Sequence, residues 1–438
     1  MTWNFGQQLD AASVQAAGVT DNPEFIDIAD LCAPVLTDLQ KQAMAWADAH
    51  PVPFNEEGIL AAAREATGLR DFGDPGFRKN MAKWIESTLA DTELTALGRL
   101  AIFSGMVRTA GVRLRIEDMV RRFPEIPDIE IERPLIIAGL PRSGTTYLQN
   151  FLAADPRLRA LPYWEAVRPV PTPEERCVAG QEDPRRAQCA ADWVKQDALL
   201  PYVKAIHEFT PDHISEDIEF QTPEFGSYYL DWQTYATVWR EYYYKLDHRP
   251  VYRYMKKCLQ VLTFLTGRKR WLLKCPQHME QLVVLNEVFP DATIIINHRD
   301  PVASIQSAMT GYAYSARIQR TKIRPDQIAE YWIDRYERLL RACVRDRGVL
   351  DEARTVDVYF HELMKDPMKI VGEIYAKAGL PLSEGMRTLM TESLAHHKRG
   401  KNGQIVYNLR RDFNLEPAQI RQRFGFYFDR FAVKAEVK

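Results

Sequence analysis

The residues best suited to chemistry form a short loop in the stretch GLPRSGTTYLQNFLAADP, which begins at Gly139. One cation, Arg142, lies inside the loop and two threonine hydroxyls follow it. Backbone N–H groups of such a loop, together with the positive end of a following helix dipole, can hold a phosphate. The stretch therefore predicts a site for one phosphate and an attached anionic group, formed by Arg142, Ser143, Gly144, Thr145 and Thr146.

The loop differs at one position from the P-loop of nucleoside triphosphatases. Gly139 and Gly144 occupy the glycine positions of G-x-x-x-x-G-K-[ST], but Thr145 stands where those proteins have lysine. Without the lysine that reaches the β- and γ-phosphates, hydrolysis of ATP or GTP is a poor fit, and the site needs no magnesium ion. By itself the string could also be an ordinary strand-to-helix turn, but its position after an aliphatic run favours an anion site.

A second motif, INHRDPVASIQSAM, again begins where a strand is expected to end and a helix to begin. Arg299 at the strand end and Ser307 two turns into the helix can converge on one anion. This spacing predicts a second, separate phosphate site. The alternative is structural: Asp300 caps the helix, Pro301 takes its first position, and Arg299 forms a surface salt bridge.

Together the two motifs resemble those of the sulfotransferases that use 3′-phosphoadenosine 5′-phosphosulfate (PAPS). GLPRSGTTYLQNFL resembles their 5′-phosphosulfate loop and HRDPVASIQS their 3′-phosphate motif, with the lysine-bearing WLLKCPQHM between them. The resemblance covers roughly residues 134 to 430. It is closest to bacterial enzymes that share P-R-S-G-T-T with tyrosylprotein sulfotransferases. The aryl and steroid branch usually has lysine at the position of Arg142, which weighs against a flat phenol or steroid as acceptor.

The resemblance implies a sulfotransferase that moves the sulfuryl group of PAPS to a hydroxyl or amine, without a metal. It places Arg299 and Ser307 on the 3′-phosphate, under a closing loop that contains Lys398, Arg399 and Gly400. That basic string is also typical of an ordinary exposed turn.

In-line sulfuryl transfer also requires a proton acceptor and a charge near the transferring group. Lys274 ends the strand RWLLK and could reach that group, or could point into water. Glu165, in LPYWEAVRP, lies where the related enzymes place a glutamate thought to act as base; a surface turn is the alternative. His278 is the rival base, because it follows Lys274 by four residues and titrates in the right range. A histidine bonded to backbone at a helix start is its alternative reading.

The elements that must position these residues alternate along the chain. Short aliphatic runs predict strands at 134–139, 270–274, 292–297 and 355–360, and helical periodicity follows each. This pattern predicts an α/β fold: a P-loop-type parallel sheet flanked by helices on both faces.

Residues 1–130 are predicted as a helical N-terminal region, and residues 131–438 as the PAPS-binding domain. A helical, aromatic-rich insert at about 156–265 could form an apolar acceptor pocket or ordinary core. EPAQIRQRFGFYFDRF, near the end, predicts a closing amphipathic helix.

Composition narrows the class of partners. The net charge of −2 predicts no nucleic-acid partner, and no apolar run is long enough for a membrane span. Without a leader-like N-terminus, and with six scattered cysteines, we expect a cytoplasmic protein. The expected partner is a small-molecule or lipid acceptor, and the expected state is a monomer or homodimer. A P-loop kinase and a non-catalytic nucleotide-binding adaptor are the alternative functions.

Overall fold

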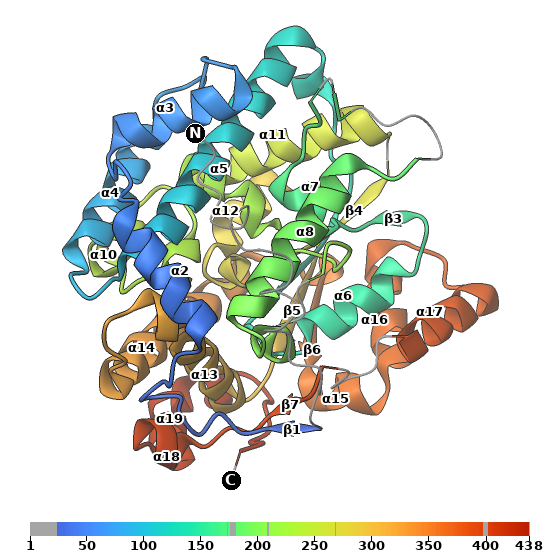
Figure 1. Cartoon of the computed structure of the whole chain (residues 1–438). Coiled ribbons are helices and arrows are strands. Elements are labelled where there is room, and N and C mark those ends of the chain that lie inside the picture. Colours follow the sequence, from blue (N-terminus) through green and yellow to red (C-terminus); the bar gives the residue numbers. More distant parts are fainter. Residues whose placement is uncertain are drawn as a thin grey trace.

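Five parallel strands form the central sheet, in the order β3-β4-β2-β5-β6 (Figure 1). The computed structural model describes residues 24–172, 174–175, 181–207, 210–267, 269–396 and 402–437. The strands are β2 (Leu135–Gly139), β3 (Leu158–Arg159), β4 (Arg270–Lys274), β5 (Thr293–His298) and β6 (Thr355–Tyr359). The four predicted strands are confirmed, each within one residue of its predicted bounds. Sequence patterns miss β3, because two residues give no hydrophobic run.

Both faces of the sheet are covered by helices, which confirms the predicted α/β fold. Leu135 and Ile137 of β2 join one hydrophobic cluster, whereas Ile136 and Ala138 join another on the opposite face. The first face packs against α6 (Thr145–Ala153), α15 (Phe360–Lys365), α16 (Pro367–Ala378) and α17 (Glu384–His396). The second packs against α11 (Arg249–Thr266), α12 (Leu282–Val288), α13 (Pro301–Gln319) and α14 (Pro325–Asp346). Within the described ranges, no helix has the length and apolarity needed to cross a membrane.

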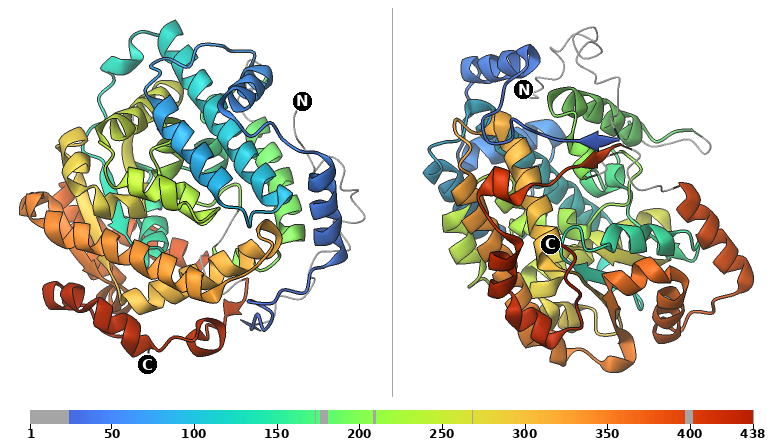
Figure 2. Two further views of the ribbon diagram at one scale, coloured as in Figure 1. Left: turned by 90° about the vertical axis from the view of Figure 1, so that its left-hand side faces the viewer. Right: turned by 90° about the horizontal axis from the view of Figure 1, so that it is seen from below.

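Within the N-terminal region predicted as helical, the described residues contain the expected helices. They are α2 (Asp38–Ala49), α3 (Glu56–Thr67), α4 (Phe77–Ala90) and α5 (Ala96–Arg122), drawn in blue to cyan in Figure 2. Side-chain caps fix the starts of α2, α3 and α5; at α5, for example, the Thr95 hydroxyl accepts from the Gly98 N–H at 3.0 Å. A domain boundary near residue 130 stays a prediction.

The aromatic-rich insert contributes to the protein core. It contains α7 (Tyr163–Val167), α8 (Pro184–Leu199), α9 (Val203–Ile206), α10 (Thr237–Tyr243) and the 3₁₀ turns η3 (Asp217–Phe220), η4 (Thr222–Glu224) and η5 (Tyr228–Trp232). Phe225 and Trp239 of the insert are fully buried, and their ring centroids lie 5.4 and 5.8 Å from that of Trp84 in α4. These aromatic side chains hold the N-terminal helices against the insert.

The C-terminal segment runs back across the sheet edge. It contains α18 (Leu409–Phe413), α19 (Pro417–Arg423), α20 (Gly425–Arg430) and the strand β7 (Gln404–Ile405), which pairs with β1 (Phe25–Ile26). The predicted single closing helix is wrong, because two short helices take its place. The helix is interrupted at Phe424, where the N–H bonds three residues back to Arg421, and Gly425 is a poor helix former.

Candidate active site

The predicted anion loop joins β2 to α6 at the carboxyl edge of the sheet. Ser143 folds it back, because its Oγ and its N–H donate to the Leu140 carbonyl at 2.6 and 3.1 Å. Gly144 has a φ of 88°, and a Cβ at this position would lie 2.9 Å from Cδ2 of Phe360. Only glycine fits there. The predicted order of strand, glycine-bracketed loop and helix is confirmed.

Arg142 occupies the middle of this loop with a φ of 68°. This left-handed conformation costs a residue other than glycine about 1–2 kcal/mol, and strain of this kind often marks functional sites. The side chain is exposed, and none of the side chains that the structure describes pairs with its guanidinium. The N-cap of α6, Gly144, has no side chain to accept from the first N–H groups. The loop thus presents a cation and an uncapped helix N-terminus to an anion.

The hydroxyls of the loop differ in their exposure. Ser143 and Thr145 are buried in the turn, whereas Thr146 is exposed on the first turn of α6. The Ser143 side chain therefore shapes the loop, and Thr146 faces the solvent from which an anion would arrive.

Arg299, in the second predicted motif, contacts the anion loop of the first motif. The register between β2 and β5 sets Gly139 beside Asn297, so both strands end at the same edge. From there the Arg299 guanidinium donates to the backbone carbonyl of Arg142 and stacks over the Phe360 ring, 3.8 Å from its centroid. It also forms an ion pair with Glu436, with a 2.7 Å distance between Nη2 and Oε2. The two motifs are therefore neighbours in space.

The structural reading of the second motif also holds. Asp300 caps α13 by accepting from the Val302 N–H at 3.0 Å, and Pro301 is the first helical residue. Ser307 is buried, and its Oγ lies 2.9 Å from the Tyr407 hydroxyl. Its described contact is thus with Tyr407, while Arg299 contacts the loop.

Lys274 does not point into water, because its side chain is only 2% exposed. Its Nζ donates to Oε1 of Glu216 at 2.7 Å, across 58 residues of sequence. Glu216 is a site residue that sequence reasoning missed. The available signal was the carboxylate-rich string SEDIE inside an otherwise aromatic segment.

His278 is fully buried in the 3₁₀ turn η6 (Pro276–Glu280), which directly follows β4. Its Nδ1 lies 2.9 Å from the Tyr252 hydroxyl, and its Nε2 lies 2.9 Å from Oδ2 of Asp217. Its partners are therefore side chains, and the alternative of a histidine bonded to backbone is wrong. The ring sits next to a carboxylate, the arrangement that orients a base.

Glu165 is also buried, so the surface-turn alternative is wrong for it. Arg159 Nη2 donates to Oε1 at 2.9 Å and to Oε2 at 2.8 Å, and the Arg159 guanidinium lies over the Trp271 ring. Burial raises the pKa of the Glu165 carboxyl, although the charges of Arg159 and Arg185 oppose this effect. A raised pKa suits a base, whereas the two-oxygen pairing with arginine suits a structural anchor.

The remaining predicted residues, Lys398, Arg399 and Gly400, lie outside the described residues. In the part of the chain that is described, no group of three or more His, Cys, Asp or Glu side chains is placed to hold a metal ion.

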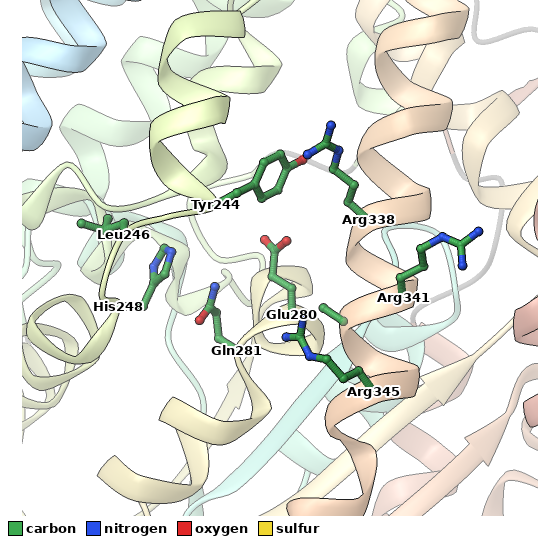
Figure 3. A pocket seen from close by; sticks show the side chains of 9 residues that line it. Tyr244, Leu246, His248, Glu280, Gln281, Arg338, Arg341 and Arg345 are labelled. Atoms are coloured by element: carbon green, nitrogen blue, oxygen red, sulfur yellow. The ribbon is translucent and has the colours of Figure 1, made fainter.

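A separate cavity of about 430 Å³ lies between α14 and η6 (Figure 3). Arg338, Arg341 and Arg345 of α14 border it, together with His248 and Glu280. None of the residues predicted to act in chemistry lines this cavity.

Known proteins match the chain over the region that holds these motifs. Residues 134–384 match the model described as the Sulfotransferase family. Because this match spans more than half of the chain, the protein belongs to the sulfotransferase family, as the motifs predicted. It is an enzyme that transfers sulfur-containing groups.

Mycobacterial sulfotransferases are among its relatives. The omega-hydroxy-beta-dihydromenaquinone-9 sulfotransferase Stf3 of Mycobacterium bovis is 23% identical over 319 residues, covering 67% of this chain and 75% of that protein. The crystal structure of sulfotransferase STF9 from Mycobacterium avium is similar with a TM-score of 0.78 and 26% identity, covering 88% of this chain and 98% of that one. STF1 from Mycobacterium tuberculosis gives a TM-score of 0.74 at 26% identity, over 85% and 98% of the two chains.

Proposed function

We propose that this sulfotransferase takes the sulfuryl group from PAPS and transfers it to a hydroxyl of a lipid-like acceptor. The assignment of PAPS as donor is supported by the contact between the two anion motifs, in which Arg299 donates to the carbonyl of Arg142. PAPS bears a 3′-phosphate and a 5′-phosphosulfate on one ribose, so it requires two anion sites side by side. The ends of β2 and β5 supply two such sites at one edge of the sheet.

Each end of PAPS has its own set of residues in this proposal. Arg142, the loop N–H groups and the threonine hydroxyls hold the 5′-phosphosulfate and stabilise the charge that develops on the departing phosphate oxygen. Arg299 and Ser307 hold the 3′-phosphate, under a loop predicted to contain Lys398, Arg399 and Gly400. Lys274 approaches the transferring group from β4, the strand next to β2. These roles require no metal ion.

The proton acceptor has two sequence-based candidates, and both stay predictions. Glu165 combines burial with a raised pKa, but both of its oxygens accept from Arg159. His278 follows β4 closely, and its ring faces Asp217 and Tyr252. Glu165→Gln and His278→Gln variants test both candidates, because loss of the base should slow transfer by about 10²- to 10⁴-fold, and a parental rate in both variants would assign the proton to another residue.

The name of the relative Stf3 supports a lipid acceptor, since that enzyme acts on a hydroxylated menaquinone. We extend this class to the present protein: a hydroxyl on an apolar molecule, presented to the loop end of the sheet. An amine acceptor, a cytoplasmic location and a monomeric or homodimeric state stay predictions from sequence.

Calorimetric titration with adenosine 3′,5′-bisphosphate, the product that PAPS leaves behind, tests the donor assignment. We expect this ligand to bind without magnesium and at least 10-fold more tightly than ATP. A kinase would show the opposite preference and would require magnesium. Failure of adenosine bisphosphate to bind would contradict the proposed donor.

The carboxylate of Glu436 forms an ion pair with Arg299, whose guanidinium the proposal assigns to the 3′-phosphate. The pair is partly exposed, with side chains 15% and 28% accessible, so it is worth about 1 kcal/mol. Glu436 must leave when the phosphate arrives, and Glu436→Gln should therefore tighten adenosine bisphosphate binding by about 3- to 10-fold.

Glu287→Gln is a matched control for this prediction, because Glu287 forms an exposed ion pair with Arg249 outside the loop region. Its affinity should equal that of the parent. Weaker binding by Glu436→Gln would show that the C-terminal segment supports the site and does not compete with the ligand.

A further inference from the structure

Backbone hydrogen bonds of the preceding residue hold Glu216 in place. The preceding residue, Ser215, donates its N–H to the Leu161 carbonyl at 2.7 Å. The Ser215 carbonyl accepts from Nε2 of Gln149 at 3.3 Å, and Gln149 lies on α6, the helix that begins at the anion loop. The position of Glu216 is thus tied to the loop through Gln149, a buried residue of the short helix α6.

The Glu216 carboxylate has one oxygen engaged and one available. Oε1 accepts from Lys274, while no donor among the described residues contacts Oε2. The Glu216 side chain is 22% exposed, in contrast to 2% for Lys274. A molecule that enters from solvent can therefore reach the carboxylate next to the buried ammonium group.

The pKa of one buried phenol, that of Tyr336 in α14, responds to the charges of both Glu216 and Arg142. Burial raises the pKa of this phenol; Glu216 raises it further, and Arg142 lowers it together with Arg335. The Tyr336 oxygen has no hydrogen-bond partner among the described residues, although the residue is only 2% exposed.

We propose that Glu216 is the base that takes the proton of the acceptor hydroxyl. When PAPS binds, Lys274 gives up its ion pair with Glu216 and contacts the sulfuryl group instead. This inference rests on the proposed donor. The acceptor oxygen forms a bond to sulfur as the bond between sulfur and the 5′-phosphate oxygen breaks. The electron pair of that bond leaves with adenosine 3′,5′-bisphosphate, and the hydroxyl proton moves to Glu216 and then to water.

The contacts of Glu216 distinguish it from the two bases predicted from sequence. Both carboxylate oxygens of Glu165 already accept from Arg159, and His278 is fully buried. Glu216 alone of these three touches Lys274, which the proposal places at the transferring group. In the free enzyme, Lys274 and Glu216 compensate each other's charge. When PAPS binds, the Glu216 carboxylate is released for proton transfer.

The test measures transfer from sulfur-labelled PAPS into an extract of hydroxylated lipids, with Glu216→Gln and Glu219→Gln compared with the parent. Glu219 is a control from the same segment, because its carboxylate pairs with Arg108. We expect Glu216→Gln to lower kcat by about 10²- to 10⁴-fold, whereas Glu219→Gln should keep a rate close to that of the parent.

Measurements of ligand binding distinguish a failure of this inference from a failure of the donor assignment. Glu216→Gln should still bind adenosine bisphosphate, and should bind PAPS more tightly than the parent does because Lys274 is already free. A parental kcat in Glu216→Gln would overturn the inference. Failure of the parent to bind adenosine bisphosphate would instead overturn the donor assignment.

Discussion

Replacing Arg142 with alanine should lower kcat for sulfuryl transfer by about 10²- to 10³-fold, the usual cost of removing one group that stabilises developing charge. The guanidinium is exposed in the loop and pairs with no described side chain, so the free enzyme loses no internal contact. The backbone carbonyl of Arg142, which accepts from Arg299, stays in place. Transfer of label from PAPS, measured with the adenosine bisphosphate affinity, reports the effect.

Arg142→Lys is the matched control for this experiment. It keeps the positive charge and the strained backbone position but loses the planar, two-pronged geometry of arginine. We expect it to retain more activity than Arg142→Ala and to unfold at the same urea concentration. A rate for Arg142→Ala within a few-fold of the parent would contradict the role of this side chain at the 5′-phosphosulfate.

Replacing Arg335 with methionine should have the largest effect on stability, lowering the free energy of unfolding by about 3–5 kcal/mol. Arg335 is 1% exposed; its Nη1 donates to Glu280 at 2.8 Å and its Nε to Asp231 at 3.2 Å. Without the guanidinium, two buried carboxylates lose their shared cation. Because Glu280 belongs to η6, the change also loosens the turn that carries His278. Urea unfolding followed by tryptophan fluorescence measures the loss.

Arg338→Met, one turn away on α14, is the control for the replacement of the buried Arg335. Its guanidinium is 44% accessible and pairs with Asp334, and such exposed pairs contribute about 1 kcal/mol or less. Equal unfolding midpoints for the two variants would show that the buried cluster contributes no more than a surface ion pair.

Much of the fold could be predicted because its signals are local. PLIIAG and RWLLK are short, buried strands whose aliphatic runs are visible in the sequence, and both appear at the predicted places. The two-residue strands β1, β3 and β7 carry no such run, since partners distant in sequence define them. The prediction of one closing helix was wrong for a related reason: the amphipathic spacing continues through Phe424, but the helix breaks at that residue and a second helix starts at Gly425.

The sequence by itself determined the two motifs and their places at the ends of strands, because a glycine-bracketed loop and a strand-end arginine are set by residues adjacent in the chain. It also determined the family. Only the tertiary structure decided which charges meet: Lys274 with Glu216 across 58 residues, and Arg299 with Glu436 across 137. No periodicity records contacts over such separations, since they depend on how helices and loops cross the sheet edge. For the same reason the pairing of Glu165 with Arg159, over the ring of Trp271, became visible only in the folded chain.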